Sequence, residues 1–458
     1  MSNILLIEPN YRSKFPPLGL LRIASYHKNI GDNVTFTRGC NLELRNLQWD
    51  KIYVSSLFTY GLPCTVKTLK FYRNSVNSFK DLIVGGIGVT LMPDYILQNV
   101  DCRIVTGPLL QPNILNGEKQ AIAKYIPDYE IIDSPFWSYS PRNSYFCRVT
   151  TGCIRHCPFC AVPILEPEFR YLQPLQEQIS NIVRNYGERQ NLVLMDNNIL
   201  ACDRFDNVIT DIQKAGFEQN SKLNNRKRIV DFNQGIDARL INKKIAKLLS
   251  TIYVSPIRLA FDYRGIENAY TRAIKLLANQ GFINFTNYVM FNYNDTPRDF
   301  YYRIRLNALM SKQLGIRVTG FPMKYAPIND VSRRHIAPRW KWRYLRGIQC
   351  ILLATHGLVS PNLDFFKISF GSSFHEFCEI ISMPDRYIIQ RMKYEQNGYK
   401  QKWQELFHNL TKISQNEFLD ALAILCRSRK KKEVISKYRQ FRKLFEHYYP
   451  NGEPVACE

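Results

Sequence analysis

Residues 147–170 read CRVTTGCIRHCPFCAVPILEPEFR, and the rest of the chain is organised around this stretch. Cys153, Cys157 and Cys160 form a C-x3-C-x2-C triplet within it. Three thiolates on one loop can hold three irons of a 4Fe–4S cube and leave the fourth iron without a protein ligand. Three buried core cysteines are the alternative, because free cysteine is often buried. A zinc site normally needs four ligands, and no second Cys pair or His pair follows at zinc-finger spacing.

The composition predicts a globular protein. A chain of 458 residues with 45% hydrophobic residues is long enough for two or three domains and a large core. The start, MSNILLIEPN, lacks the basic and apolar regions of a signal peptide, and no apolar run is long enough for a membrane helix. We therefore expect a cytoplasmic protein with no membrane partner, whose cysteines are reduced thiols or metal ligands.

The chain carries a formal net charge of +23, from 62 Lys and Arg against 39 Asp and Glu. This excess favours an anionic partner such as nucleic acid or a phosphorylated substrate. A merely solvated basic surface is the alternative. The run from Arg427 to Lys432 has the same two interpretations, a phosphate-binding segment or a solvated helix face.

The N-terminal part alternates strand and helix signals. Short apolar runs predict strands at 3–7, 34–39, 51–58 and 81–88, with helices at 20–31 and around 66–76. This alternation predicts a doubly wound, Rossmann-like parallel sheet over residues 1–122. Residues 123–144 are rich in Pro, Ser and aromatic side chains and are expected to form a linker.

Six further strand signals alternate with helices over residues 145–330. They fall at 145–150, 191–200, 228–240, 257–265, 284–296 and 316–328. The cysteine loop follows the first of them, at the strand end where such barrels carry their sites. Residues 331–458 are basic and predict a mostly helical C-terminal domain. The predicted fold class is therefore α/β with a helical C-terminal region.

Thr151-Gly152 before the triplet and Pro158-Phe159 within it make the loop resemble the radical S-adenosylmethionine (SAM) superfamily. The resemblance implies a partial (β/α)6 TIM-type barrel over 145–330. It also implies that a 4Fe–4S cluster on the three cysteines cleaves SAM reductively to a 5′-deoxyadenosyl radical, which abstracts hydrogen from a substrate. An external electron donor such as flavodoxin or ferredoxin is implied as well.

Residues 1–122 resemble the cobalamin-binding-type domain that precedes many such barrels, with 85–97 and 116–122 similar to its later strand–loop segments. The family's cobalt-ligating D-x-H-x-x-G is absent, because the corresponding stretch reads EPNYRSKFPPLG, and His27 comes too late. Cobalamin without a lower His ligand, a vestigial scaffold and a substrate-docking domain all remain open. Gly85, Gly86 and Gly88 allow either close approach of a ligand or a tight turn.

The resemblance also suggests residues that contact SAM. Phe159 matches the aromatic position near adenine, with core packing as the alternative. Met195-Asp196-Asn197-Asn198 resembles a D-D-N variant at the end of the second strand. Asp196 or Asn198 is expected to accept a hydrogen bond from the methionine ammonium. The alternative is that these residues simply form a turn, where Asp and Asn are common.

The ends of the later strands offer further polar groups. Gln234, Asp237 or Arg239 is expected to hold the ribose hydroxyls or the methionine carboxylate, unless Asp237 and Arg239 form a structural ion pair. Weaker candidates follow on the last three strands, and Asp295 also reads as a helix-start signal. These weaker candidates are Asp262, Asn292, Asp295, Met323 and Tyr325.

Three functions remain open from the sequence, and no residue is assigned a catalytic role. The first is a radical SAM enzyme with an unidentified, anionic or nucleic-acid-derived substrate. The second is a cobalamin-dependent radical SAM methyltransferase or small-molecule-modifying enzyme. The third is a non-catalytic iron–sulfur protein that binds nucleic acid or senses redox state. Cys147 and Cys202 lie near the loop as hydrogen donors or methyl acceptors, or as ordinary packing residues.

Overall fold

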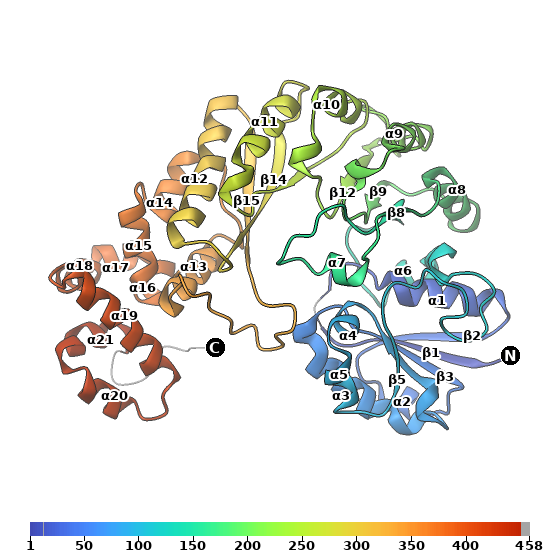
Figure 1. The fold of residues 1–458 in the computed structure, drawn as a ribbon, viewed down its shortest axis with the longest axis horizontal. Helices are drawn as coiled ribbons and strands as arrows, with labels where there is room; N and C mark the ends of the chain where they lie inside the picture. Colours follow the sequence, from blue (N-terminus) through green and yellow to red (C-terminus); the bar gives the residue numbers. More distant parts are fainter. Residues whose placement is uncertain (12, 450–458) are drawn as a thin grey trace. The chain divides into compact units, whose positions relative to one another are not determined.

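The computed structural model describes residues 1–11 and 13–449 (Figure 1). The chain divides into two compact units, the first comprising Met1–Arg258 and Ala326–His335. The second comprises Leu259–Tyr325 and the chain from Ile336 onward. Among the described helices, none has both the length and the apolar character needed to cross a membrane.

A five-stranded parallel sheet forms the N-terminal part of the first unit, in the order β2-β1-β3-β4-β5 (Figure 1). Its central strand β1 is buried on both faces. Ile4 and Leu6 pack against α1, whereas Leu5 and Ile7 pack against α3. This explains the unbroken apolar run in the sequence and confirms the predicted Rossmann-like sheet. The elements are β1 (Asn3–Glu8), α1 (Leu18–Asn29), β2 (Asn33–Arg38), α2 (Leu42–Arg45), β3 (Lys51–Ser55), α3 (Leu62–Tyr72), β4 (Leu82–Gly85) and β5 (Arg103–Val105).

The stretch 85–97 differs from the expected strand–loop segment. Only Gly85 belongs to a strand, and two short helices follow, α4 (Ile87–Leu91) and α5 (Pro93–Leu97). Gly86 precedes α4 with a φ of 98°, and Pro93 occupies the first turn of α5. A proline fits the first turn of a helix because the amide it lacks has no intrahelical partner there.

All six strands predicted after residue 144 are present. They form two three-stranded sheets, β12-β9-β6 and β13-β14-β15. Their ranges are β6 (Ser144–Cys147), β9 (Asn191–Leu194), β12 (Ile229–Phe232), β13 (Ile257–Ala260), β14 (Asn284–Phe291) and β15 (Arg317–Lys324). β9 pairs in parallel with both β6 and β12, and β14 pairs in parallel with β15. The helices between them are α8 (Leu175–Tyr186), α9 (Phe205–Lys214), α10 (Lys243–Leu249), α11 (Glu267–Ala278) and α12 (Pro297–Leu314).

The C-terminal region is helical, as predicted. Its helices pack with α12 and β14 around one core in the second unit, where Trp403 is fully buried. The basic run from Arg427 to Lys432 joins α19 to α20. The helices are α13 (Trp342–Ala354), α14 (Leu363–Phe370), α15 (Phe374–Ser382), α16 (Asp385–Ile389), α17 (Arg391–Gln396), α18 (Tyr399–His408), α19 (Lys412–Arg427), α20 (Lys431–Lys437) and α21 (Arg442–Tyr448).

Candidate functional site

The three cysteines lie on a loop that is closed at its base. β7 (Thr150–Thr151) and β8 (Arg170–Tyr171) pair antiparallel on either side of it. Gly152 begins the loop with a φ of 74°, and a Cβ there would clash with the carbonyl of Glu168. Only glycine fits this backbone, so the Gly before the first cysteine has a steric cause.

Asp196 fixes the chain just before this loop. Its Oδ1 accepts from the amides of Val149 at 3.0 Å and Thr150 at 2.5 Å, and from the Thr150 hydroxyl at 2.7 Å. Burial raises the pKa of Asp196, although the bonds from Thr150 and Val149 and the nearby Arg148 charge oppose the rise. The carboxylate therefore holds β7, while its predicted contact with SAM stays a prediction.

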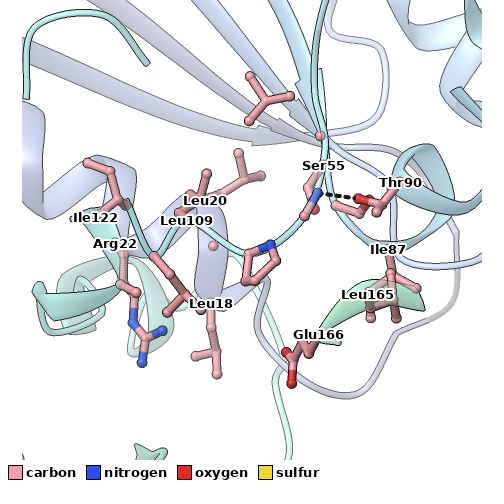
Figure 2. A pocket seen from close by; sticks show the side chains of 18 of the residues that line it. Leu18, Leu20, Arg22, Ser55, Ile87, Thr90, Leu109, Ile122, Leu165 and Glu166 are labelled. Atoms are coloured by element: carbon pink, nitrogen blue, oxygen red, sulfur yellow. Dashed lines mark hydrogen bonds between the residues drawn. The ribbon is translucent and has the colours of Figure 1, made fainter. Parts of the chain in front are cut away.

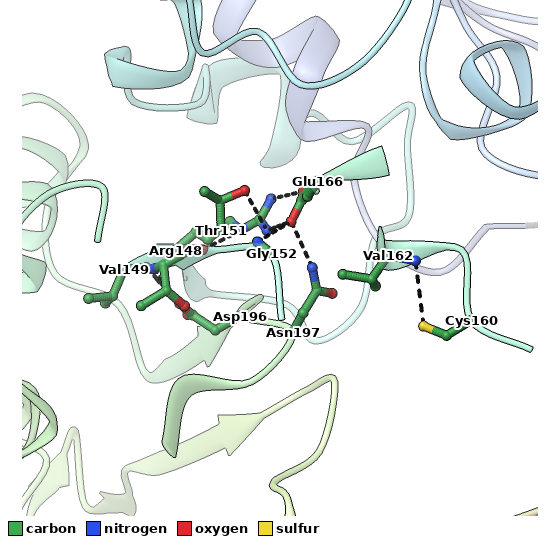
Figure 3. A network of polar contacts seen from close by, with 10 residues as sticks. Arg148, Val149, Thr151, Gly152, Cys160, Val162, Glu166, Asp196 and Asn197 are labelled. Atoms are coloured by element: carbon green, nitrogen blue, oxygen red, sulfur yellow. Dashed lines mark hydrogen bonds and ion pairs between the residues drawn. The ribbon is translucent and has the colours of Figure 1, made fainter. Parts of the chain in front are cut away.

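Glu166 is the centre of a polar network that ties the far side of the loop to its start (Figure 3). Arg148 donates to both of its carboxylate oxygens. The Gly152 amide donates to Oε2 at 2.7 Å, and the Asn197 side chain donates to the same oxygen at 2.8 Å. Burial alone would raise the pKa of Glu166, but Arg148 and Gly152 outweigh it and hold the pKa below its usual value.

Two sulfurs of the cysteine loop, those of Cys153 and Cys160, accept hydrogen bonds. Cys153 Sγ accepts from the Arg155 amide at 3.3 Å and from Asn198 Nδ2 at 3.4 Å. Cys160 Sγ accepts from the amide of Val162 at 3.5 Å, at the start of α7 (Val162–Leu165). Donors aimed at sulfur favour the thiolate form that a metal cluster needs.

The described residues bring no three His, Cys, Asp or Glu side chains together around a single metal ion. A cubane makes no such demand, because each thiolate binds a different iron. The half-buried Cys153, Cys157 and Cys160 share one loop whose sulfurs are supplied with donors. Three half-buried thiols on one loop therefore fit a cluster.

Asn198 is a predicted SAM contact whose side-chain acceptor is bonded to no described residue. Its side chain is 3% exposed, and its Oδ1 has no hydrogen-bond partner among the described residues. A buried acceptor without a partner is costly, so a ligand donor is the expected occupant. Its Nδ2 already bonds Cys153, which places this free acceptor next to the cluster loop.

The third strand is joined to the cysteine loop through Asp237. Its carboxylate accepts from Arg155 Nε at 3.0 Å and from Arg239 Nε at 2.7 Å. Burial would raise the pKa of Asp237, but the two arginines lower it below the usual value. The structural ion pair between Asp237 and Arg239 thus forms. Gln234 is exposed beside it and lines the cavity described below.

The remaining sequence candidates occupy varied surroundings. Phe159 is half-buried in the turn where the Cys160 amide donates to the Cys157 carbonyl at 3.0 Å. Cys147 is buried in β6, where burial raises the pKa of its thiol to about 12, as expected for a packing residue. Cys202 is 5% exposed just after the second strand's loop.

The weaker candidates lie in the second unit and mostly bond to their own surroundings. Asp295 accepts from Arg303 Nη2 at 2.6 Å and from Trp340 Nε1 at 3.0 Å. It is not the cap of α12, because Thr296 caps this helix together with Asp299. The same unit contains the other weaker candidates, Asp262, Asn292, Met323 and Tyr325. Asn292 Oδ1 accepts a hydrogen bond from the Ala337 amide at 2.9 Å, and Asp262 Oδ1 accepts one from the Met290 amide at 3.4 Å. Met323 is 48% exposed.

A cavity of about 560 Å³ lies within the first unit (Figure 2). One part of its wall is the carboxyl edge of the N-terminal sheet, with Ser55, Gly85 and Gly86, together with the start of α1. The other part belongs to the cysteine loop and the second and third strands. These residues are Arg148, Cys160, Ala161, Val162, Leu165, Glu166, Leu172, Met195, Asn197 and Gln234. The volume is within the range of about 300–1,000 Å³ that cofactor sites occupy.

Two sequence features of the N-terminal domain now have a structural explanation. His27 lies inside α1 and bonds Asp32 at 2.8 Å and the Tyr53 hydroxyl at 3.1 Å, and no described residue lining the cavity is a histidine. Gly86 and Gly88 are set by packing, since a Cβ on Gly86 would approach the Ser56 carbonyl to 2.6 Å. The glycines therefore make a tight strand-to-helix turn, and Gly85 and Gly86 also line the cavity.

Three charged residues in the cavity wall were not identified from the sequence. They are Arg22, Arg148 and Glu166. The sequence contains a pattern that could have identified two of them. Arg148 interrupts a strand pattern, and Glu166 follows the apolar run AVPIL. Arg22 sits in an ordinary amphipathic helix, where an arginine normally reads as a surface residue.

Comparisons with known proteins find a structural likeness only. No family model matches the chain, and no curated protein matches it. The chain is similar in structure to the cobalamin-dependent S-adenosylmethionine radical enzyme OxsB, solved with aqua-cobalamin and S-adenosylmethionine bound. The TM-score is 0.51 and the sequence identity is 13%. The match covers 99% of this chain and 77% of the OxsB chain. A second OxsB structure, with aqua-cobalamin bound, has the same TM-score and identity. That match covers 73% of this chain and 55% of OxsB, so there the chain spans about half the length of its relative.

The likeness concerns the fold. The chain shares with OxsB an N-terminal parallel sheet of the cobalamin-binding type, followed by further parallel sheets and a helical region. The fold predicted from the sequence is thereby confirmed.

Proposed function

We propose that this chain is a radical SAM enzyme whose 4Fe–4S cluster is held by Cys153, Cys157 and Cys160. One observation carries the proposal: a single cavity is lined both by Cys160 and by the carboxyl edge of the parallel sheet. A ligand in this cavity would lie beside the cluster loop. Ligands of open α/β sheets bind at the carboxyl edge of the sheet. A ligand bound there would therefore also contact the cysteine loop.

The residues around the loop suit a bound SAM. The unpartnered Oδ1 of Asn198 can accept from the methionine ammonium, and Gln234 offers a further amide group at the cavity wall. When bound, the cluster and SAM supply a 5′-deoxyadenosyl radical for hydrogen abstraction. Val162 and Leu165 give the cavity wall an apolar part beside the cysteine loop. An external donor of the flavodoxin or ferredoxin type would supply the electron.

Anaerobic reconstitution of the full chain tests this function. We expect about four irons and four sulfides per chain, and release of 5′-deoxyadenosine from SAM after reduction. An intact, reducible cluster that releases none would overturn the enzymatic proposal. It would favour instead a redox-sensing or nucleic-acid-binding protein.

The cavity also favours a second candidate, an enzyme that uses cobalamin as well as SAM. The sheet edge is of the cobalamin-binding type, and the OxsB structures that share this fold contain aqua-cobalamin. Because no described residue lining the cavity is a histidine, cobalamin would bind here without a protein imidazole on cobalt. Titration with hydroxocobalamin, followed by absorbance, should then saturate at one equivalent. Absence of binding would remove this candidate and leave the first intact.

A further inference from the structure

Arg22 lies in the wall of the cavity and has no partner within residues 1–11 and 13–449. Its Nε is buried and makes no hydrogen bond, and no ion pair or hydrogen bond involves its guanidinium among the described residues. In Figure 2 its side chain ends among the cavity-lining residues with no bond marked to it. The residue as a whole is partly exposed and lines the cavity, so its charge is open to an anionic ligand there.

The groups that act electrostatically on Arg22 supply no counter-charge. Burial and, to a lesser extent, the Arg148 charge lower its pKa to about 10, so Arg22 remains a cation at neutral pH. Arg148 itself is neutralised by Glu166. Burial also raises the pKa values of Cys147 and Tyr129, so both are uncharged at neutral pH. One positive charge is therefore left over.

The same wall contains the start of α1. This 12-residue helix follows Pro17, has no side-chain cap and has no acidic residue in its first turn. Leu18, Gly19 and Leu20 line the cavity, and a Cβ placed on Gly19 would meet no atom within 4 Å. The amides of a helix N-terminus attract anions, and this helix start lies in the cavity wall.

We propose that Arg22 and the N-terminus of α1 form a subsite for a phosphate group of the ligand that occupies this cavity. Arginine forks and helix N-termini both suit phosphate oxygens. The subsite deepens the proposed function, because it assigns a phosphorylated compound to the cavity next to the cysteine loop. The phosphate belongs either to the substrate or to the nucleotide loop of a corrinoid.

The subsite is tested by adding inorganic phosphate to the full chain. Chloride at the same ionic strength is the control. Binding is followed by calorimetry and by melting temperature. Arg22→Gln should weaken phosphate binding at least about tenfold, as expected for a charged hydrogen bond. Arg22→Lys should retain part of the affinity. Arg184→Gln, which removes an exposed arginine of α8 outside the cavity, should change nothing.

Without phosphate, Arg22→Gln should melt no lower than the wild type, because the guanidinium makes no ion pair or hydrogen bond with the described residues. This measurement shows that any loss of phosphate affinity in Arg22→Gln does not come from unfolding of the variant. Wild-type affinity in Arg22→Gln, or no phosphate binding by the wild type, would overturn the proposal. Neither result depends on SAM cleavage, so failure of the subsite and failure of the proposed function are distinguishable.

Corrinoids identify the source of the phosphate. Cobalamin carries a phosphodiester in its nucleotide loop, and cobinamide lacks it. If Arg22→Gln weakens binding of cobalamin but not of cobinamide, the subsite holds the cofactor's phosphate. If the variant binds both as the wild type does, or if neither corrinoid binds the wild type, the subsite holds a substrate phosphate. An equal loss for both corrinoids would contradict a phosphate subsite.

Discussion

The side-chain amide of Asn198 donates a hydrogen bond to the sulfur of Cys153 over 3.4 Å. The second strand's polar end is thereby joined to the first cysteine of the loop. The other end of the same amide, Oδ1, has no partner in the described part of the chain. One side chain therefore stabilises a thiolate and offers an acceptor beside it.

Two substitutions at Asn198 separate these roles. Asn198→Asp keeps an acceptor but removes the donor to Cys153, so the cluster should assemble with a more negative reduction potential. Asn198→Ala removes both groups and should lower SAM cleavage by about 10–100-fold, the usual cost of losing an outer partner of a metal site. Potentiometric titration and 5′-deoxyadenosine yield measure the two effects. Asn185→Ala, on the exposed face of α8, is the matched control. Unchanged cleavage in Asn198→Ala would rule out its role.

Glu166 makes the stability of the loop dependent on pH. Arg148 and the Gly152 amide hold its pKa below the usual value of a glutamate. The carboxylate therefore stabilises the fold at a pH above that usual value, and this contribution is lost as the pH falls through the folded-state pKa. Glu166→Gln should cost about 3 kcal/mol in free energy of unfolding at pH 7, because Arg148 loses its counter-charge.

Denaturant unfolding at pH 7 and at pH 3.5 measures this effect. The difference in stability between wild type and Glu166→Gln should be smaller at the lower pH. A difference of equal size at both values would show that the ion pair is not its source.

Asp196 is predicted to act on the loop backbone. Asp196→Ala leaves the amides of Val149 and Thr150 without an acceptor, at about 1–3 kcal/mol each. We expect a lower melting temperature and less iron per chain after reconstitution. Asp196→Asn keeps an acceptor and removes a buried charge whose pKa burial has raised, so it should be milder. If Asp196→Ala retained full stability and iron content but lost SAM binding, the carboxylate would be a SAM contact instead.

Local patterns in the sequence were enough to predict the loop and most of the strands, although β5 was not among the predicted strands. The unbroken apolar run of β1 reflects burial on both of its faces, and the six later strands follow the same kind of signal. Gly152 marks the start of the loop because its backbone has a positive φ and no space for a side chain. These features depend on residues that are close together in the sequence, so a single sequence is enough to predict them.

The polar partners of the site could not be predicted in the same way. Asp196 and Thr150 are 46 residues apart, and Arg148 and Glu166 meet only once the loop has closed. Several acidic and basic groups compete for each partner, and the sequence does not rank them. Arg22 is the extreme case, since its significance lies in the absence of a partner among the described residues.

The central claim is that Cys153, Cys157 and Cys160 hold a 4Fe–4S cluster with one iron open to SAM. The most direct test is the electron paramagnetic resonance spectrum of the reduced, reconstituted protein before and after SAM is added. We expect a cluster signal that SAM shifts in the wild type and in Cys40→Ala, where an exposed cysteine outside the loop is removed, and no cluster signal in Cys157→Ala. A cluster that persists in Cys157→Ala, or a wild-type spectrum that SAM leaves unchanged, would contradict the claim.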